Sequence, residues 1–546
     1  MLTSHIKESP IKGLIGLGGG ATGLLQTGAE ADTYWWTLVG TNDYNGASGM
    51  RSKLTVDSKG DVYVGGLTGV SSSKAGTVWK FDKKGAFQFD KKFSTGTNPI
   101  THEGIDALGV DSSDNIFVFT RCFKTVDSYS GSYSANIQSI SMMRCNTSLV
   151  VQDQVEFGSD GTDQGGAGQM IDNARQVVTD GTHIYVAGTL SAGVVATSSP
   201  YWIGDRYSDG GLTKINISTR AVAWQKMYDQ SKGAAPDNNT VYGWTANEML
   251  DCAVDSSGNV YVCGYDRCGS GGSESPYIAM FNSSGTLQWD YVVNHNVTSL
   301  DNKGEFRGIA VDSQGDCVVV GRAVVGAYNG IVQKYNSSGT VQWSHALGGG
   351  FPSRFNDVAI DSDDNIYTCG WSEKTTNSSK TVGDAMWITK WNSSGTLQWQ
   401  RIVGIIGSAW YAYQDTGFAE IAIDSNDNII VSGLTHGKAG TTWGPANPES
   451  SIHILTMKLP NDGSLTGEYT SATTGNLAYV AADVGASGHL LDGGTSYTND
   501  WPLYLTSSGS TGPGIWHDGN TAVNTSNSSS WSSSDVTTDQ FQQDLS

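Results

Sequence analysis

The sequence is short of positive charge, cysteine, proline and long apolar runs, and each shortage narrows the class of protein. Basic residues number 32 against 53 acidic ones, which gives a formal net charge of −21. Such an acidic chain repels phosphate backbones, so we expect no nucleic-acid partner. Seven cysteines in 546 residues are too few for a disulfide framework. No apolar run reaches the roughly 18 residues that a membrane-spanning helix needs, so we expect no membrane span.

The residues that are abundant favour short strands joined by tight turns. The chain contains 70 glycines, 17 tryptophans and 23 tyrosines, and 16% of its residues are charged. Aromatic residues favour strands, whereas long helices need more Ala, Glu, Lys and Leu. Cys252 and Cys263 fall on the two arms of one expected hairpin. A bridge between them is one interpretation, and the favoured one is that both are small buried apolar groups.

An internal repeat organises most of the chain. Four copies align closely, of which Cys252–Gly264 and Ile421–Gly433 are examples, and three more align weakly. In each copy an apolar run is followed by a polar turn that opens with Asp, and then by a second apolar run that usually ends in Gly. The seven marker aspartates are Asp57, Asp111, Asp180, Asp255, Asp312, Asp361 and Asp424.

A second hairpin motif follows each copy, most clearly as Asn-Ser-Ser-Gly-Thr-x-Gln-Trp in residues 282–289, 336–343 and 392–399. Asp or Asn opens these turns by bonding the backbone two residues on, and Gly closes them in the left-handed conformation. Two hairpins per repeat make four antiparallel strands. Seven such units predict an all-β, seven-bladed β-propeller with four-stranded antiparallel blades.

The closure of the ring can also be predicted. The seventh copy lacks the Trp that normally ends a repeat, and a matching strand, Tyr34–Gly40, precedes the first copy. We therefore expect residues 33–40 to form the outer strand of the last blade, with Trp35, Trp36 and Leu38 as the ring-closing residues. This divides the chain into a Gly-rich N-terminal anchor or tail (1–32), the propeller (33–470) and a C-terminal β-rich, Ser/Thr-rich extension (471–546).

The repeat resembles the bacterial β-propeller repeat family labelled SBBP over about residues 33–470, and most specifically in repeats four to seven. This resemblance implies a fold that occurs in secreted and surface proteins, without shared catalytic residues. The Gly-rich opening, Ser9–Leu24, resembles the start of virion proteins of marine tailed phages. Residues 11–25 are apolar but interrupted by glycines, so they make a poor signal peptide.

One face of the propeller is expected to bind a ligand. The turns within each hairpin are short and uniform, whereas the connections on the opposite face are long, variable and aromatic. Insertions gathered on one face usually mark the binding face, and Trp and Tyr beside Asp and Asn suit sugars or a protein partner. The alternative is that these aromatic residues pack their own loops against the blades. The candidate binding residues are Tyr201, Trp202, Tyr207, Tyr242, Trp244, Trp410, Tyr411, Tyr413 and Trp443.

Motifs for catalysis, metals or cofactors do not stand out. No zinc spacing, nucleophile elbow, P-loop or dinucleotide fingerprint occurs. The acidic turns Asp361–Asn365 and Asp424–Asn428 lack the loop spacing and the terminal Glu of a calcium site, so turn formation explains them better. We expect no metal, no cofactor and no enzymatic activity. Carboxylate pairs contributed by distant loops keep a glycan-degrading enzyme as a third interpretation.

These observations together favour a non-enzymatic virion surface or structural protein of a tailed phage, either a tail or fibre adhesin or a capsid decoration. It would present a propeller face to a host-surface glycan or protein. The N- and C-terminal extensions would bind other virion proteins, with several copies of the chain on each particle. The alternative is a secreted or cell-surface bacterial propeller that binds glycans or proteins. Ala478–Val484 and Trp501–Thr506 are expected as strands of a small appended unit, and residues 524–546 as a loose segment.

Overall fold

The structure is a computed structural model of the chain. It describes residues 34–40, 52–68, 75–95, 104–129, 133–157, 169–192, 208–229, 247–268, 273–293, 304–325, 327–347, 353–372, 375–377, 380–382, 385–405, 417–436, 452–471, 475–481, 490–491, 503–505, 515–518, 525–526, 531–534 and 539–544.

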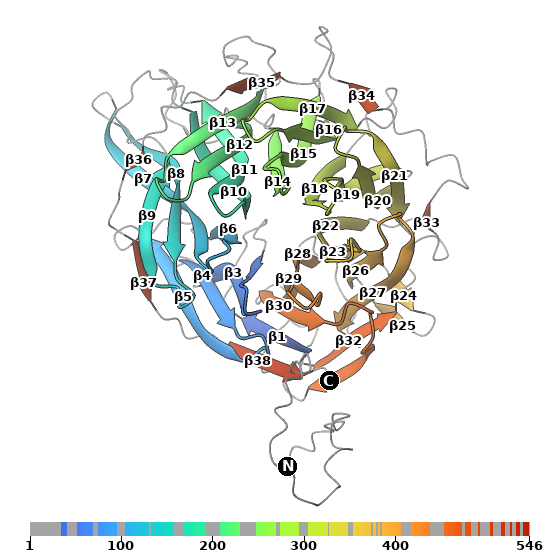
Figure 1. Cartoon of the computed structure of the whole chain (residues 1–546). Helices are drawn as coiled ribbons and strands as arrows, with labels where there is room; N and C mark the ends of the chain where they lie inside the picture. The colour runs from blue at the N-terminus through green and yellow to red at the C-terminus, as the bar shows by residue number, and fades with distance from the viewer. Residues whose placement is uncertain are drawn as a thin grey trace, which may run out of the picture.

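Seven antiparallel sheets stand around a central axis and form a seven-bladed β-propeller, as predicted (Figure 1). Blade 1 contains β2 (Lys53–Val56), β3 (Val62–Thr68), β4 (Ala75–Phe81) and β5 (Phe87–Thr95). Blade 2 contains β6 (Ile105–Val110), β7 (Ile116–Tyr129), β8 (Tyr133–Cys145) and β9 (Val151–Phe157). Blade 3 contains β10 (Gln169–Thr179), β11 (His183–Ala192), β12 (Ser208–Asn216) and β13 (Val222–Asp229).

The later blades repeat this order. Blade 4 contains β14 (Glu248–Val254), β15 (Val260–Cys268), β16 (Ser273–Phe281) and β17 (Leu287–Val293). Blade 5 contains β18 (Gly304–Val311), β19 (Cys317–Val325), β20 (Ala327–Tyr335) and β21 (Val341–Leu347). Blade 6 contains β22 (Ser353–Ile360), β23 (Ile366–Ser372), β26 (Ala385–Trp391) and β27 (Leu397–Ile405), with a small hairpin, β24 (Thr375–Asn377) and β25 (Lys380–Val382), between β23 and β26.

Blade 7 closes the ring because it combines strands from the beginning and the end of the propeller sequence. It contains β28 (Gly417–Ile423), β29 (Ile429–His436), β30 (Ile452–Leu459) and, from the N-terminal side, β1 (Trp35–Gly40). β1 pairs antiparallel with β30, with Trp35 opposite Lys458 and Leu38 opposite Leu455. Trp35 and Trp36 are buried, so the predicted ring-closing strand is confirmed.

The apolar core lies between neighbouring blades rather than at the axis. Trp36 packs in one cluster with residues of blades 6 and 7, such as Ile388 and Val431. Trp35 packs in another cluster that joins blade 7 to blade 1. Cys252 and Cys263 are buried free thiols, as the favoured interpretation held. Burial raises the pKa of both thiols well above the usual range.

The Trp-ended motif recurs along the chain because its Trp packs against the next blade. The indole of Trp289 in blade 4 lies against Gly339 in the outer turn of blade 5, and its Nε1–H donates to the Ser337 carbonyl at 3.0 Å. Gly339 has a φ of 79°, and a Cβ there would lie 2.8 Å from the indole. Trp35 makes the same contact with Gly85 of blade 1, which explains why the seventh blade takes its Trp from the N-terminal strand.

The C-terminal part of the chain adds further strands to the outer edges of the blades. β31 (Gly467–Ser471) and β32 (Gly475–Ala481) extend blade 6. The chain then adds one outer strand to each of the other blades in reverse order, ending beside β1 in blade 7. We call β32 to β38 the C-terminal belt (Figure 1). Its later strands are β33 (Leu490–Leu491), β34 (Leu503–Leu505), β35 (Ile515–Asp518), β36 (Thr525–Ser526), β37 (Trp531–Ser534) and β38 (Asp539–Asp544).

This belt differs from the expected small unit and loose tail. Residues 524–546 contain three of the paired strands, and no separate unit forms among the described residues beyond 471. The physical reason is that the segment has too few apolar residues for its own core. It needs only backbone hydrogen bonds to extend sheet edges that already exist.

Candidate functional site on the inner strands of the blades

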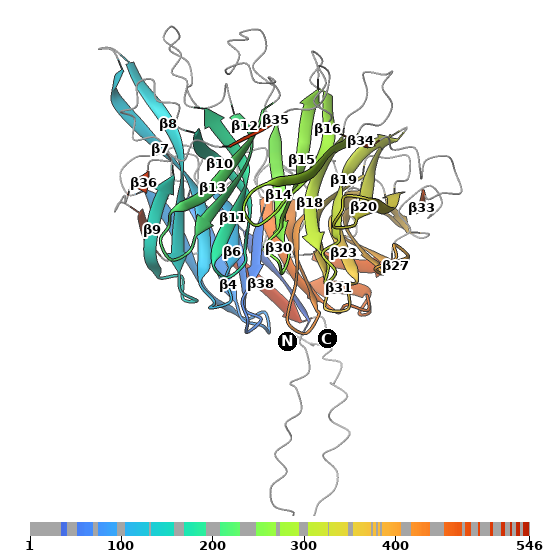
Figure 2. The ribbon, with the colours of Figure 1, turned by 45° about the horizontal axis from the view of Figure 1, so that its top comes forward.

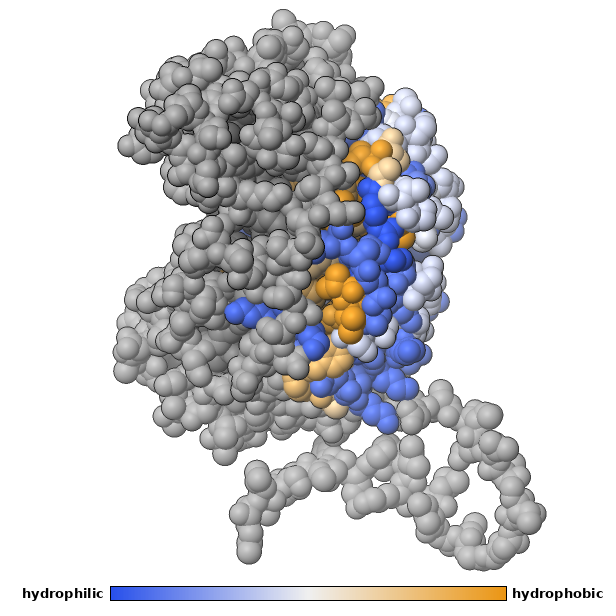
Figure 3. All heavy atoms as spheres, turned by 90° about the vertical axis from the view of Figure 1, so that its left-hand side faces the viewer, coloured by the Kyte–Doolittle hydropathy of each residue, from blue (hydrophilic) through white to orange (hydrophobic). Residues whose placement is uncertain are grey.

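The two faces of the ring differ. The turns that join the first to the second and the third to the fourth strand of a blade lie on one face, which we call the short-turn face. The connections between the second and third strands, and between one blade and the next, leave from the opposite, long-connection face. β7 and β8 of blade 2 project beyond the other strands on the long-connection face (Figure 2). On the short-turn face, at the right of Figure 3, the described residues are mostly hydrophilic, with small apolar patches between them.

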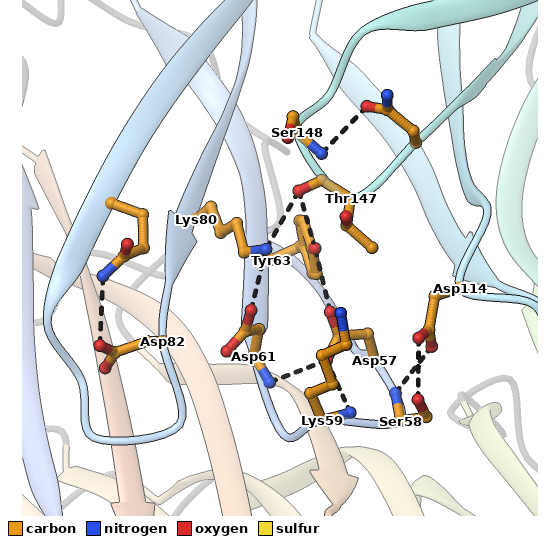
Figure 4. A network of polar contacts seen from close by, with 12 residues as sticks. Asp57, Ser58, Lys59, Asp61, Tyr63, Lys80, Asp82, Asp114, Thr147 and Ser148 are labelled. Atoms are coloured by element: carbon orange, nitrogen blue, oxygen red, sulfur yellow. Dashed lines mark hydrogen bonds and ion pairs between the residues drawn. The ribbon is translucent and has the colours of Figure 1, made fainter.

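On the short-turn face, hydrogen bonds stabilise the turns and join some neighbouring blades. In blade 1, one carboxylate oxygen of Asp57 accepts the backbone N–H groups of Lys59 and Asp61 at 3.0 and 2.9 Å. Ser58 donates its N–H and its hydroxyl to Asp114 of blade 2, at 2.9 and 2.8 Å (Figure 4). The same Ser-to-Asp link joins blade 5 to 6 and blade 6 to 7. The acidic turns therefore serve turn and blade contacts, as the turn interpretation predicted.

A polar hollow of about 580 Å³ interrupts this face between blades 2, 3 and 4. It forms where the turn of blade 3 is one residue shorter than its counterparts, so that His183 stands where blade 1 has Asp61. Burial raises the pKa of Asp180, but hydrogen bonds from Thr182, Tyr185 and the local backbone outweigh it and lower this pKa to about 2. Lys214 donates to the Ser283 carbonyl at 3.0 Å. The polar groups of the hollow are thus bonded to one another.

The aromatic residues expected to bind a ligand all lie outside the described residues. This holds for Tyr201, Trp202, Tyr207, Tyr242, Trp244, Trp410, Tyr411, Tyr413 and Trp443. The strands that flank their segments are described, and the strand ends to which these segments connect lie on the long-connection face. Their role in binding therefore stays a prediction.

The inner strands carry a feature that the repeat alignment does not reveal. The inner strand of each blade from 2 to 7 contains a β-bulge, and Arg175 and Arg307 occupy this position in blades 3 and 5. Bulges turn side chains away from the regular pleat and are frequent beside functional sites. The bulge also explains the Gly that closes the repeat motif, which lies within the second strand of the blade. A Cβ on Gly321 would lie 1.9 Å from the Glu305 carbonyl oxygen.

A layer of buried carboxyl groups follows the bulges and joins the inner strands of neighbouring blades. Asp251 of blade 4 accepts the Ile309 N–H of blade 5 at 2.7 Å. Asp357 of blade 6 accepts the Ile421 N–H of blade 7 at 2.9 Å. Glu420 of blade 7 accepts the Leu54 N–H of blade 1 at 2.6 Å. Each carboxylate thus fixes the inner strand of the next blade.

Two of these carboxyl groups, Asp251 and Asp357, lie in an environment that disfavours their charged form. Burial raises the pKa of Asp251 to about 7, against the lowering effect of its hydrogen bonds and of Lys53. Burial, with Asp251 and Glu420 near by, also raises the pKa of Asp357. The Lys53 ammonium pairs with Glu420 at 2.8 Å and donates to the Arg175 carbonyl of blade 3 at 2.5 Å. Lys53 of blade 1 therefore links the inner strands of blades 3 and 7 at this depth.

Above this layer, three guanidinium groups meet one carboxylate at the long-connection end of the inner strands. The Nε of Arg307 and the Nε of Arg322 lie 2.6 and 2.9 Å from the Glu305 Oε1. The Nη1 of Arg354, from blade 6, lies 3.9 Å from the same oxygen. The guanidinium of Arg354 also stacks over the Trp371 ring, 5.6 Å from its centre. We call Arg307, Arg322 and Arg354 the arginine cluster.

A second ion pair occupies the same rim over blades 3 and 4. Arg175 pairs with Glu248, and the Tyr265 hydroxyl donates to the other oxygen of Glu248 at 3.1 Å. Four of the eleven arginines of this acidic chain, Arg175 and the arginine cluster, therefore lie on or beside the inner strands of blades 3, 5 and 6.

Sequence reasoning missed these residues because they lie at the edges of the aligned copies. One sequence pattern could have indicated them. Each closely aligned copy is preceded by a short run at the bulge of the inner strand, such as Phe306-Arg307-Gly308 or Phe355-Asn356-Asp357. The described residues contain no group of three or more His, Cys, Asp or Glu side chains that could hold a metal ion. No helix in the part of the chain that the structure describes could cross a membrane.

Comparison with known proteins adds little beyond the architecture. No family model matches the sequence, and no curated protein is similar to it. Similar solved structures include Sqt1 of Chaetomium thermophilum bound to the N-terminus of the ribosomal protein L10, with 11% identity, a TM-score of 0.37, and coverage of 78% of this chain and 99% of that one. The extracellular domain of a putative one component system from B. thetaiotaomicron has 13% identity, a TM-score of 0.34, and coverage of 79% and 40%.

An intramolecular trans-sialidase from Ruminococcus gnavus, in complex with oseltamivir carboxylate, has 10% identity and a TM-score of 0.32, and the match covers 61% of this chain and 91% of that one. Likenesses this weak carry no argument about function, and the assignment of the fold rests on the topology of the chain itself. The resemblances to the bacterial propeller repeat family and to tailed-phage virion proteins stay predictions.

Proposed function

We propose that this protein is a non-enzymatic binding protein that holds a glycan or a protein of a cell surface on its long-connection face. The virion of a tailed phage is the setting we favour, with the chain acting as an adhesin or a capsid decoration in several copies. The terminal extensions would contact other virion proteins.

The observation that carries this proposal is the difference between the two faces. On the short-turn face, the turns are short, and three of the described ones bond the next blade through a Ser-to-Asp link. On the opposite face, the strand ends lead into connections of different length and aromatic composition, and the inner strands hold Arg175 and the arginine cluster near these ends. A rigid ring that varies its sequence on one face matches the way scaffold folds present binding loops.

Aromatic substitutions test the binding face. We expect a variant with Trp202, Trp244, Trp410 and Trp443 all changed to Ala to lose at least about tenfold in affinity for its cell-surface ligand, because buried aromatic anchors dominate such interfaces. Glycan arrays and pull-down from host envelope fractions would measure the loss, with circular dichroism to check the fold. The matched control changes Gln288, Gln342 and Gln398 to Ala on the short-turn face. Equal binding by both variants would move the ligand away from the long-connection face.

Peptide mass spectrometry on density-purified virus particles tests the setting. Stoichiometric peptides from this chain would support a virion component, and their copy number would separate a capsid decoration from a tail part. If the chain occurs only in the cell envelope or secreted fraction, the alternative of a bacterial surface propeller replaces the virion.

A further inference from the structure

Beyond the bonds that fix Asp180 and Lys214, the polar hollow between blades 2, 3 and 4 keeps hydrogen-bond donors to spare. Its lining includes Lys214 together with Ser112 and Ser256. Both serines are exposed and bond to no described residue, whereas Lys214 is only 7% exposed. A ligand that enters from the short-turn face therefore meets hydroxyl groups at the rim and a buried ammonium group beneath them.

Lys214 lacks the ion pair that three of the other four lysines at its place in the blade make. These three pair with carboxylates of their own blades at 2.6 to 2.9 Å, and they are Lys80, Lys334 and Lys458. Within the described part of the chain, Lys214 makes no ion pair, because His183 stands where blade 1 has Asp61. One of its three N–H groups donates to the Ser283 carbonyl at 3.0 Å. A buried ammonium without a counter-ion is costly, so an anion would be stabilised beside it.

Ser112 carries a pair of donors that binds a carboxylate elsewhere in the ring. In blade 1, Ser58 donates its N–H and its hydroxyl to Asp114 of the next blade, and blades 5 and 6 repeat this link. Ser112 has the same place in blade 2, but it faces Gly181 of blade 3. A Cβ on Gly181 would lie 3.4 Å from the Ser112 Oγ, and both residues line the hollow. The position that an Asp carboxylate occupies in other blades is therefore open here.

The acidic surroundings do not prevent a carboxylate from binding to such a donor pair. Asp114 shares its site with Asp57 and Asp61, and all three act through their charge on Tyr63 (Figure 4). The Ser58 N–H nevertheless holds the pKa of Asp114 below its usual range. The hollow in blade 3 has one carboxylate fewer, since His183 replaces Asp61 there, so its surroundings oppose an anion less.

We propose that this hollow binds an acidic segment of a partner protein, whose carboxylates pair with Lys214 and accept the N–H and hydroxyl of Ser112. The site lies on the short-turn face, so the inference goes beyond the proposed function and does not depend on it. A protein segment is favoured over a small anion or a sugar acid because the ring itself presents Asp114 to this donor pair from a tight turn.

The test uses the full chain and a capped peptide with the sequence of residues 361–365, Asp-Ser-Asp-Asp-Asn. In this turn Asp364 is the residue that accepts from Ser313 of blade 5, and a matched peptide has Asn in place of each Asp. We expect calorimetry to show that the acidic peptide binds about tenfold or more tightly, as a charge-assisted hydrogen bond implies. Lys214→Gln should remove this preference. Lys390→Gln should leave it intact, because Lys390 has the same place in blade 6 but does not line the hollow.

Gly181→Asp fills the open position from within the chain and covers the case in which Lys214→Gln does not fold. Gly181 has a φ of 84°, in the left-handed region that Asp114 adopts at 60° and that Asp tolerates. We expect this variant to fold, as circular dichroism would check, and to bind the acidic peptide about tenfold more weakly. Gly60→Asp is its control, at a φ of 83° but away from the hollow.

Three results would overturn the inference. The first is equal affinity of the acidic and amide peptides for the wild type. The second is an intact preference in folded Lys214→Gln or Gly181→Asp. The third is binding of inorganic phosphate or glucuronate that is as tight as that of the acidic peptide and equally sensitive to Gly181→Asp, which would assign the hollow to small anions.

Discussion

Single residues set the contact between blades. Gly339 and Gly315 have the same φ of 79°, which a side chain rarely adopts, yet their surroundings differ. A Cβ at Gly339 would meet the Trp289 indole, whereas the nearest atom to a Cβ at Gly315 is an Asp255 oxygen 3.8 Å away. Asp364 and Asp427 hold the same left-handed conformation in other turns and use their carboxylates to bond the preceding blade. The repeat therefore tolerates Asp or Gly at this place for different reasons.

This pair of glycines separates backbone strain from packing. We expect Gly315→Ala to lower the free energy of unfolding by about 1 kcal/mol, which is the cost of a left-handed Ala. Gly339→Ala should cost about 1–3 kcal/mol more, because the indole must move from its place. Urea unfolding followed by tryptophan fluorescence measures both. Equal losses in the two variants would show that the Trp–Gly contact does not fix the spacing of the blades.

Among the elements, β1 carries the closure of the ring. It pairs with β30 on one side and with β38 on the other, and its two tryptophans belong to two different interblade clusters. β38 has the same length of six residues but pairs only with β1. Since β38 lies outside β1, we expect the ring to depend on β1 far more than on β38.

Two deletions of equal strand length test this difference. Deleting residues 34–40 should lower the thermal midpoint sharply, because blade 7 loses its outer strand and two buried indoles. Ending the chain after residue 538 should change the midpoint by no more than a few degrees. Trp35→Ala, with an expected loss of about 3–5 kcal/mol, covers the case in which the deletion does not fold. Calorimetry decides, and an unchanged midpoint after deletion of β1 would refute closure by this strand.

At the scale of the whole molecule, the sequence predicts the ring of blades better than it predicts the inner-strand arginine cluster or the belt on the outer edges. The ring could be predicted because Asp57 and its six counterparts, together with the Trp-ended turns, repeat at positions with strict turn chemistry. The arginine cluster could not, because the bulge at Arg307 breaks the period of two on which strand patterns depend. The belt could not either, because strands such as β33 and β36 contain two residues each and obtain their pairing from an edge formed by distant sequence.

The C-terminal belt covers the outer edges of the blades around the whole ring. Strands β33 to β38 cover the outer edges of six blades, and an uncovered edge exposes unpaired N–H and C=O groups that invite pairing between chains. A chain that ends after Ala481 keeps β32 on blade 6 and loses the other six strands. We expect it to remain folded, to exchange the amide hydrogens of β5, β13 and β17 faster, and to associate as its concentration rises. Hydrogen exchange and sedimentation velocity, with the full chain as control, would measure both effects. If the truncated chain stays monomeric and its edge amides exchange at the wild-type rate, the belt does not protect the ring.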